Sequence, residues 1–177
     1  MTWSTLPAYS DGNALTAAQV TAIKDNINET APAKATTAGR LITTNGANSV
    51  AEREMNDDII NTTGTRTSSS YGNLTSGGAG PTVTVSTSVN ALTMVNVRME
   101  NSGNNACWCS FAISGATTDA SIDQRAAMAQ AGSGDANRFG VSSFNAVTAG
   151  SNTFQNEYRV TAGTGTFQDR RLVVMAL

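Results

Sequence analysis

Short segments in which apolar and polar residues alternate recur at regular intervals after Pro81. In one of them, Val95, Val97 and Met99 are separated by single polar residues. A period of two places alternate side chains on opposite faces of a strand, so each segment predicts a strand buried on one side. Clusters of Gly, Ser and Asn between the segments favour turns. The pattern predicts an antiparallel, jelly-roll-like β-sandwich over 82–177. The predicted strands cover 83–85, 95–99, 107–113, 141–147, 154–160 and 171–177.

The composition agrees with a mainly β protein. Ser, Thr, Asn and Gly make up 75 of the 177 residues, and only 14% of the residues are charged. Thr and Val favour strands, and Gly and Asn favour turns. One stretch, 122–131, fits a helical turn as well as a strand and stays open at this stage.

Charge and residue types exclude several classes of function. The net charge is −2 and the arginines are scattered, so no basic stripe is available for nucleic acid. No run of 18 apolar residues and no signal peptide is present, which predicts assembly in a cytoplasm without a membrane partner. The chain has no histidine, which excludes Ser-His-Asp and Cys-His catalysis and His-bearing zinc sites. We therefore expect no enzymatic activity, no cofactor and no metal.

The two cysteines flank Trp108 within one predicted strand. Period two places Cys107 and Cys109 on one face and Trp108 on the other. Their Cβ vectors are parallel, which suits a disulfide badly, and two thiolates fall short of a closed zinc site. We expect reduced thiols that pack as small apolar groups.

Residues 1–32 are expected to form an attachment segment. Its first part shows no periodicity, which indicates an extended arm. The apolar residues Trp3, Leu6 and Tyr9 of this arm have no core of their own, so we expect them to contact a partner protein. The alternative is that the arm folds back onto the β domain.

A helix follows the arm. Thr16 and Gln19 fit a capping box, and Leu15 can pack on Val20. Val20, Ile23 and Ile27 then form a narrow apolar stripe, and Pro32 ends the helix. A helix this short is marginal alone, so the stripe predicts either a three-helix contact with other copies or a docking surface.

Residues 33–81 are polar and rich in Ser, Thr and Gly. We expect a polar linker with short structured pieces, or a segment ordered by neighbouring subunits. The sandwich is accordingly expected to begin at Thr82.

Two groups of carboxylates could carry chemistry. The first group consists of Glu52, Glu54, Asp57 and Asp58. We expect it to form a solvated patch or an intersubunit salt-bridge region. The second lies near turns of the sandwich and consists of Asp119, Asp123 and Asp135. Its order differs from that of a calcium loop, so calcium binding and glycan cleavage remain alternatives to a structural role.

The chain ends on an apolar strand without a polar tail. Such a strand is expected to lie inside the sheet or at a subunit interface. The predicted subunit interface consists of Arg171, Val173, Met175 and Leu177.

Four stretches resemble small virion proteins of tailed bacteriophages, of the minor structural, head-decoration and tail-fibre kinds. The stretches are Trp3-x-x-Leu6-Pro-x-Tyr9-x-x-Gly12-x-x-Leu15-Thr-Ala-Ala18, the helix through Asn26-Ile27, Ala38-Gly-Arg-Leu-Ile42 and Gly163-Thr-Gly-Thr-Phe-Gln-Asp-Arg-Arg-Leu-Val-Val-Met175. The C-terminal half also resembles, in architecture only, the trimeric knobs of complement C1q and tumour necrosis factor.

The resemblance implies a homotrimeric capsid decoration (minor capsid or head-fibre) protein, located in the virion and assembled in the host cytoplasm. Its N-terminal arm would be held by the major capsid protein, with the β knob facing outward. The alternative is a tail or tail-fibre protein whose knob binds a receptor on the host surface. A third hypothesis is a carbohydrate-active module that uses the turn aspartates.

Overall fold

The computed structural model describes residues 14–28, 35–44 and 49–177. The chain divides into two compact units, Met1–Glu54 and Met55–Leu177. The described part of the first unit holds one α-helix and one β-hairpin, and the second unit is a β-sandwich.

Helix α1 (Ala17–Asn28) begins with the predicted capping box. The Thr16 amide donates to Gln19 Oε1 at 2.8 Å, and the Gln19 amide donates to Thr16 Oγ1 at 3.3 Å. Each side chain satisfies an amide that the first turn leaves unpaired, so the predicted helix start is confirmed. No helix within the described ranges is long and apolar enough to cross a membrane.

The hairpin of the first unit pairs β1 (Leu41–Thr44) with β2 (Val50–Arg53). Arg40 and Glu54 flank the hairpin and form an ion pair at 2.7 Å. For this region the sequence predicts only a polar linker with short structured pieces.

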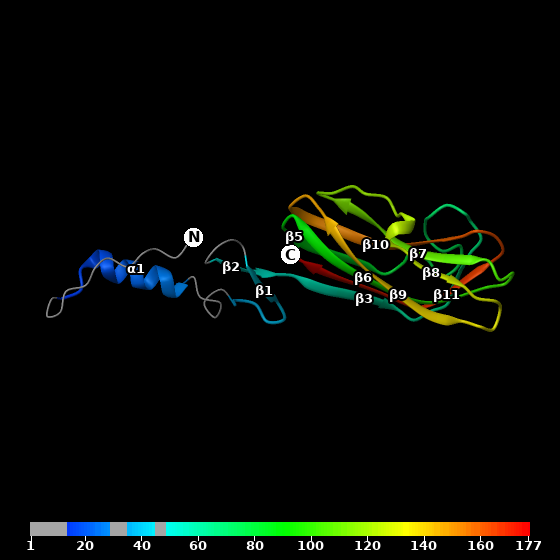
Figure 1. Ribbon diagram of the computed structural model, residues 1–177, viewed down its shortest axis with the longest axis horizontal. Helices are drawn as coiled ribbons and strands as arrows, with labels where there is room; N and C mark the ends of the chain where they lie inside the picture. Colours follow the sequence, from blue (N-terminus) through cyan, green and yellow to red (C-terminus); the bar gives the residue numbers. More distant parts are fainter. Residues whose placement is uncertain (1–13, 29–34, 45–48) are drawn as a thin grey trace. The chain divides into compact units, whose positions relative to one another are not determined.

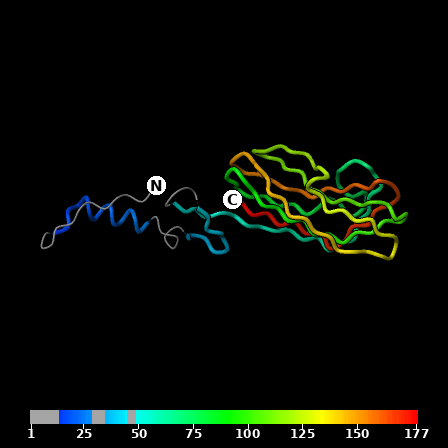
Figure 2. The backbone as a smooth tube through the Cα atoms, in the orientation of Figure 1, coloured from blue at the N-terminus to red at the C-terminus, as the bar shows by residue number. Residues whose placement is uncertain are grey.

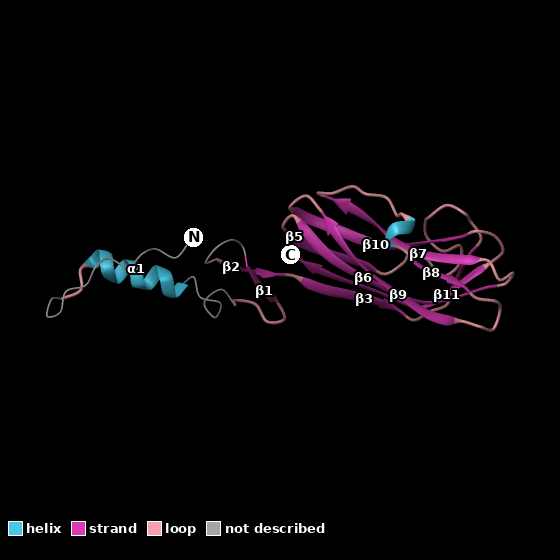
Figure 3. Cartoon of the chain, in the orientation of Figure 1, coloured by secondary structure: helices cyan, strands magenta, loops and turns pink. Residues whose placement is uncertain are grey.

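The sandwich consists of two antiparallel sheets, which Figures 1 and 3 show as two layers of strands. Its strands are β3 (Met55–Ile60), β4 (Gly64–Arg66), β5 (Thr82–Thr87), β6 (Asn90–Asn101), β7 (Ala106–Gly115), β8 (Ala127–Gln130), β9 (Asn137–Ala146), β10 (Gly150–Val160) and β11 (Gly165–Ala176). One sheet has the order β5-β10-β7-β8 and the other the order β3-β11-β6-β9, with β4 also paired to β11. The prediction of a mainly β, antiparallel sandwich is confirmed.

The alternation of apolar and polar residues along the sequence matches an alternation of buried and outward-facing side chains in the structure. Val95, Val97 and Met99 of β6 are fully buried, and their polar neighbours face outward. Tyr158 of β10 and Phe167 of β11 join the two sheets, with ring centroids 4.8 Å apart. Each inward face is mainly apolar, so the core forms where the two sheets stack.

Strand β11 lies inside its sheet, as the apolar C-terminus predicts. It pairs with β3 on one side and with β6 on the other. Figure 2 traces this last segment in red beside the green strands, and the Leu177 amide donates to the Asn90 carbonyl at 3.0 Å.

The expected boundary between linker and sandwich at Thr82 is wrong. Strands β3 and β4 pair with β11, and Leu74 is buried in the core. The segment before β5 also runs beside β10, where the Tyr158 amide donates to the Gly72 carbonyl at 2.9 Å. The segment has the polar composition of a linker. It belongs to the sandwich because its backbone pairs with β10 and β11, and composition carries no information about such pairing.

The stretch 122–131 contains both alternatives that the sequence left open. Asp123–Arg125 form one 3₁₀ turn, and β8 follows at the edge of the sheet beside β7.

Truncation should distinguish the two boundaries. A fragment of residues 55–177 is expected to unfold cooperatively, because it keeps every partner of β11. A fragment of residues 82–177 should lose near-UV circular dichroism and cooperative melting, because β11 loses β3 and β4 and the core loses Leu74. Equal melting of the two fragments would contradict the boundary at Met55.

Candidate subunit interface

The predicted attachment residues fall into two groups. Trp3, Leu6 and Tyr9 lie outside the described residues. The stripe on α1 is described, and its apolar side chains are exposed; they are Leu15, Val20, Ile23 and Ile27. Among the described residues of the first unit, the structure therefore shows these side chains exposed.

Three of the four residues predicted for the knob interface lie on the outward face of β11. Leu172, Val174 and Ala176 point into the core, and the alternate residues Arg171, Val173 and Met175 point outward. The fourth residue, Leu177, follows the strand and is half-buried.

Pairing brings further apolar residues to this face. Met175 lies opposite Met55 of β3 and opposite Leu92 of β6, and Leu92 lies opposite Phe144 of β9. These four side chains form a continuous row across four strands, here called the apolar row. Met55 is 43% exposed and Phe144 is 65% exposed. Directly opposed side chains on one face are within contact distance, so the row is a single apolar surface.

Next to the apolar row lies a shallow groove of about 340 Å³, in which Met94 and Val173 lie opposite each other. Polar groups border the groove. Arg171 donates to Asp57 Oδ2 from Nη2 at 3.0 Å and from Nε at 3.2 Å. An apolar centre with a charged margin is the usual build of a protein interface.

Sequence reasoning missed Met55, Leu92, Met94 and Phe144. The sequence of β6 does contain an indication of an apolar outward face, because Leu92 and Met94 are apolar at positions where the alternation predicts polar residues. No such signal marks Met55 or Phe144, because only strand register places them beside Met175.

The outward face of the other sheet differs. Its β5 and β10 positions carry hydroxyl and amide side chains such as Thr84, Thr153 and Gln155. Thr84 and Thr153 share a hydrogen bond of 2.8 Å across the strands. The contrast between the two faces makes the sheet of β3, β11, β6 and β9 the candidate interface.

The first carboxylate group is dispersed rather than clustered. Glu52 accepts hydrogen bonds from Thr36 and Thr37, and the Thr37 amide is the main cause of its lowered pKa. Asp58 accepts the Thr82 amide at 2.8 Å. With Glu54 and Asp57 in ion pairs of their own, each of the four carboxylates has a local partner.

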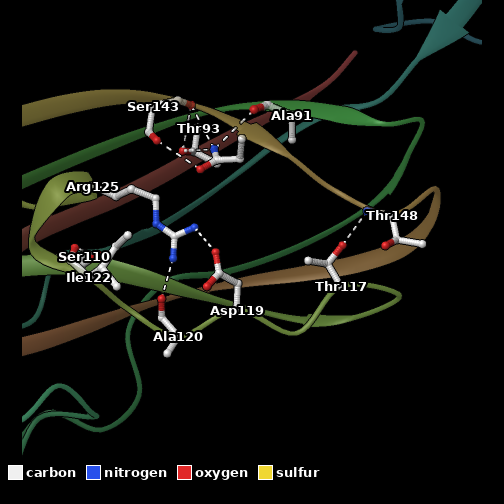
Figure 4. Close-up of polar contacts among 11 residues, drawn as sticks. Ala91, Thr93, Ser110, Thr117, Asp119, Ala120, Ile122, Arg125, Ser143 and Thr148 are labelled. Atoms are coloured by element: carbon white, nitrogen blue, oxygen red, sulfur yellow. Dashed lines mark hydrogen bonds and ion pairs between the residues drawn. The ribbon is translucent and has the colours of Figure 1, made fainter.

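The turn aspartates are also separated. Arg125 donates from Nη1 to Asp119 Oδ2 at 2.6 Å and from Nη2 to the Ala120 carbonyl, as Figure 4 shows. Asp123 accepts from Arg159 at 3.0 and 2.5 Å, whereas Asp135 lies in the β8–β9 loop. The structure does not bring these carboxylates together as a pair.

Asp123 belongs to a stacked polar cluster. The Tyr71 hydroxyl donates to Asp123 Oδ1 at 2.8 Å, and the Arg159 guanidinium lies 4.5 Å from the centroid of the Trp108 ring. The hydrogen bond from Arg159 holds the pKa of Asp123 below its usual value. A general acid needs a raised pKa, so this carboxyl is unsuited to that role.

Acid titration should expose this pairing. The contribution of Asp123 to stability is complete above the unfolded pKa near 3.8 and is lost as the pH falls through the lower folded pKa. The difference in unfolding free energy between wild type and Asp123→Asn should therefore shrink from pH 6 to pH 2.5 in urea titrations. Arg159→Met should show the same trend, because it removes the donor. A constant difference across this range would contradict the assignment.

Both thiols are free and buried in the core, as predicted. Cys107 donates to the Glu100 carbonyl at 3.2 Å. Burial raises the pKa of both Cys107 and Cys109, which keeps them as thiols. Within the described ranges, no group of three or more Cys, Asp or Glu residues could hold a metal ion.

A second depression, of about 510 Å³, lies at the turns that join β6 to β7 and β8 to β9. Gln130 lines this depression, and its side-chain amide nitrogen donates to the Asn104 carbonyl at 3.2 Å. The other lining side chains are mostly small or polar and include Asp135 and Asn137. The depression could hold a small polar ligand, and its lining has no aromatic residue for stacking.

Comparison with known proteins found similarity in structure but not in sequence. No protein-family model matches the sequence, and no curated protein matches it either. The structure is similar to VP2 of infectious bursal disease virus in its subviral particle, with a TM-score of 0.50 and 12% identity over 76% of this chain. The chain spans only 37% of that VP2 chain. At this identity the likeness shows the fold alone, and it agrees with a jelly-roll-like sandwich.

Two further structures match less well. The Eiger TNF of S. frugiperda has a TM-score of 0.47 and 11% identity, covering 71% of this chain and 92% of its own. Murine APRIL at pH 8.5 has a TM-score of 0.41 and 7% identity, covering 70% of this chain and all of its own.

Proposed function

We propose that the chain is a non-enzymatic structural protein of a tailed-bacteriophage virion, in which homotrimers decorate the capsid. The observation that carries the proposal is the apolar row, because it crosses four strands on one outward face of the sandwich. An apolar surface of this kind on a small domain favours association with another protein surface. A further copy of the same chain carries the same surface, so closed symmetry can bury it on every subunit.

The helix favours three copies over two. Val20, Ile23 and Ile27 recur at spacings of three and four residues, and isoleucine at successive core positions of such a repeat shifts the packing from two helices to three or more. Three copies of α1 side by side would cover one another's stripes. The same symmetry would bring the apolar rows of three sandwiches into contact.

Attachment is assigned to the N-terminal unit. The sandwich and Met1–Glu54 are separate compact units, so one can bind a shell protein while the other stays accessible. In the proposal, the arm with Trp3, Leu6 and Tyr9 contacts the major capsid protein. This step rests on the sequence resemblance to phage virion proteins.

The copy number of the chain in purified particles tests the proposal. Quantitative mass spectrometry should find a number of the same order as that of the major capsid protein. A number lower by about tenfold or more would favour the tail. Absence from particles would reject a virion role altogether.

The second candidate is a tail or tail-fibre protein that binds the host receptor through its knob. The polar depression at the β6–β7 and β8–β9 turns favours it, because loops at one end of a sandwich often hold ligands. Labelled full-length chain should then bind host cells, and Gln130→Ala with Asn137→Ala should weaken that binding at least about tenfold. Binding unchanged by this double substitution would place the receptor contact elsewhere.

A further inference from the structure

The core of the sandwich contains a buried positive charge. Arg170 has no exposed surface, although the sequence places it within a strand whose other arginine, Arg171, faces outward. A β-bulge explains the difference. The register between β11 and β6 shifts between Gln168 and Arg171, and Asp169 has a φ of 46°. The extra residue turns the Arg170 side chain into the core.

Polar groups without partners surround this charge. Arg170 uses only Nη2, which donates to the Thr62 carbonyl at 3.1 Å and approaches Thr62 Oγ1 at 3.4 Å. Its Nε and Nη1 have no hydrogen-bond partner among the described residues. The same holds for the Tyr158 hydroxyl and for both polar atoms of the Asn156 side chain, and these residues are also fully buried.

These three side chains are neighbours. The Arg170 guanidinium lies 5.7 Å from the centroid of the Tyr158 ring. Asn156 and the Tyr158 hydroxyl both border Gly80, because a Cβ built at Gly80 would lie 2.8 Å from Asn156 Cβ and 2.8 Å from the Tyr158 hydroxyl oxygen. Five unpartnered polar atoms therefore gather at one place, where each would cost free energy if left unsatisfied.

Among the described residues, no acidic residue is buried in the core with Arg170. The buried polar and charged residues of the described part include no Asp or Glu. Burial raises the pKa of Cys109 and of Tyr158, so both stay neutral. A buried guanidinium without a counter-charge is strongly unfavourable, which makes an anionic ligand the chemical complement of this site.

The donors present define the ligand class. Arg170 offers the N–H groups of Nε and Nη1, Tyr158 its O–H group and Asn156 the N–H groups of Nδ2, all suited to an anion. Packing restricts its size. A Cβ added at Gly80 would lie 2.8 Å from the Tyr158 hydroxyl oxygen, so the surroundings are tight. We propose that Arg170, Tyr158 and Asn156 bind a monatomic halide, chloride under physiological conditions, inside the sandwich.

Thermal unfolding of the full chain tests this site independently of any virion role. Chloride should raise Tm by about 3–8 °C at 200 mM relative to the same concentration of sodium gluconate, because a ligand that binds only the folded state stabilises it. Arg170→Met should abolish the difference. Arg138→Met is the matched control, because it removes an exposed arginine that pairs with Asp169 at 3.0 Å, and it should keep the chloride effect.

A second measurement covers the case in which Arg170→Met fails to fold. Tyr158→Phe keeps the ring and removes one donor, so it should reduce the chloride effect by half or more. Crystals of the wild-type chain soaked in bromide should show an anomalous peak beside Arg170 Nε or Nη1. Equal Tm in chloride and gluconate, or a soaked crystal without this peak, would overturn the proposal and leave these donors to water or to one another.

Discussion

Replacing Met175 by lysine is expected to convert the proposed trimer into monomers at micromolar concentration. Met175 occupies a central strand of the apolar row, with Met55 and Leu92 on either side. Its side chain is half-exposed in the isolated sandwich, so a lysine there can reach water in the monomer. In the trimer, the ammonium group would be buried against apolar side chains without a partner. We expect the dissociation constant to rise at least roughly 100-fold in sedimentation equilibrium.

Met128→Lys is the matched control for this experiment. Met128 is also a methionine that a lysine can replace without losing contact with water, because it is 44% exposed, but it lies on β8 of the opposite sheet. The same substitution there should leave the oligomeric state unchanged. Dissociation by Met128→Lys instead of Met175→Lys would move the interface to the other face. A monomeric wild type would remove the role assigned to the apolar row.

Replacing Gly80 by alanine should destabilise the sandwich by about 3 kcal/mol and lower Tm by roughly 10 °C. A Cβ at this position would lie 2.2 Å from the Asn156 carbonyl oxygen and 2.8 Å from Asn156 Cβ. The nearest obstacle is backbone of a central strand, which cannot move aside without disturbing its ladder. Differential scanning calorimetry of the full chain measures the effect.

Gly132→Ala provides the comparison. Neither Gly80 nor Gly132 has the left-handed backbone that disfavours alanine, and the nearest atom to a Cβ at Gly132 is Asp135 Oδ2 at 3.7 Å. Gly132→Ala should therefore change Tm by less than about 2 °C. If Gly80→Ala were equally mild, the segment before β5 would not be packed on β10 as the structure shows.

The candidate interface could be predicted in part. Alternation along the last strand separates Leu172 and Val174 from Val173 and Met175, and the structure places the first pair in the core and the second pair on the outward face. The apolar row could not be predicted from the pattern of one strand. Met55 and Phe144 lie 120 and 31 positions away from Met175 in the sequence and meet its face only through the register of β3, β6 and β9. Register depends on which strands pair, and alternation within one strand does not specify that.

The buried charge was not foreseeable from pattern. Arg170 and Arg171 are adjacent in the sequence and look alike, and a regular strand would place one inward at a high cost. The bulge at Asp169 decides which of them is buried. A single irregular residue in one strand thus creates the polar site in the core.

The order of the residues predicts the fold class, the inward face of β6, the capped start of α1 and the free state of the two cysteines. All of these depend on neighbours within a few positions, through side-chain alternation, a capping box or the spacing of two thiols. Three features needed the folded chain: the sandwich begins at Met55, four strands share one apolar row, and Arg170 lies in the core. These features depend on pairing between distant segments, whose free energy comes from contacts that exist only once the two sheets have formed.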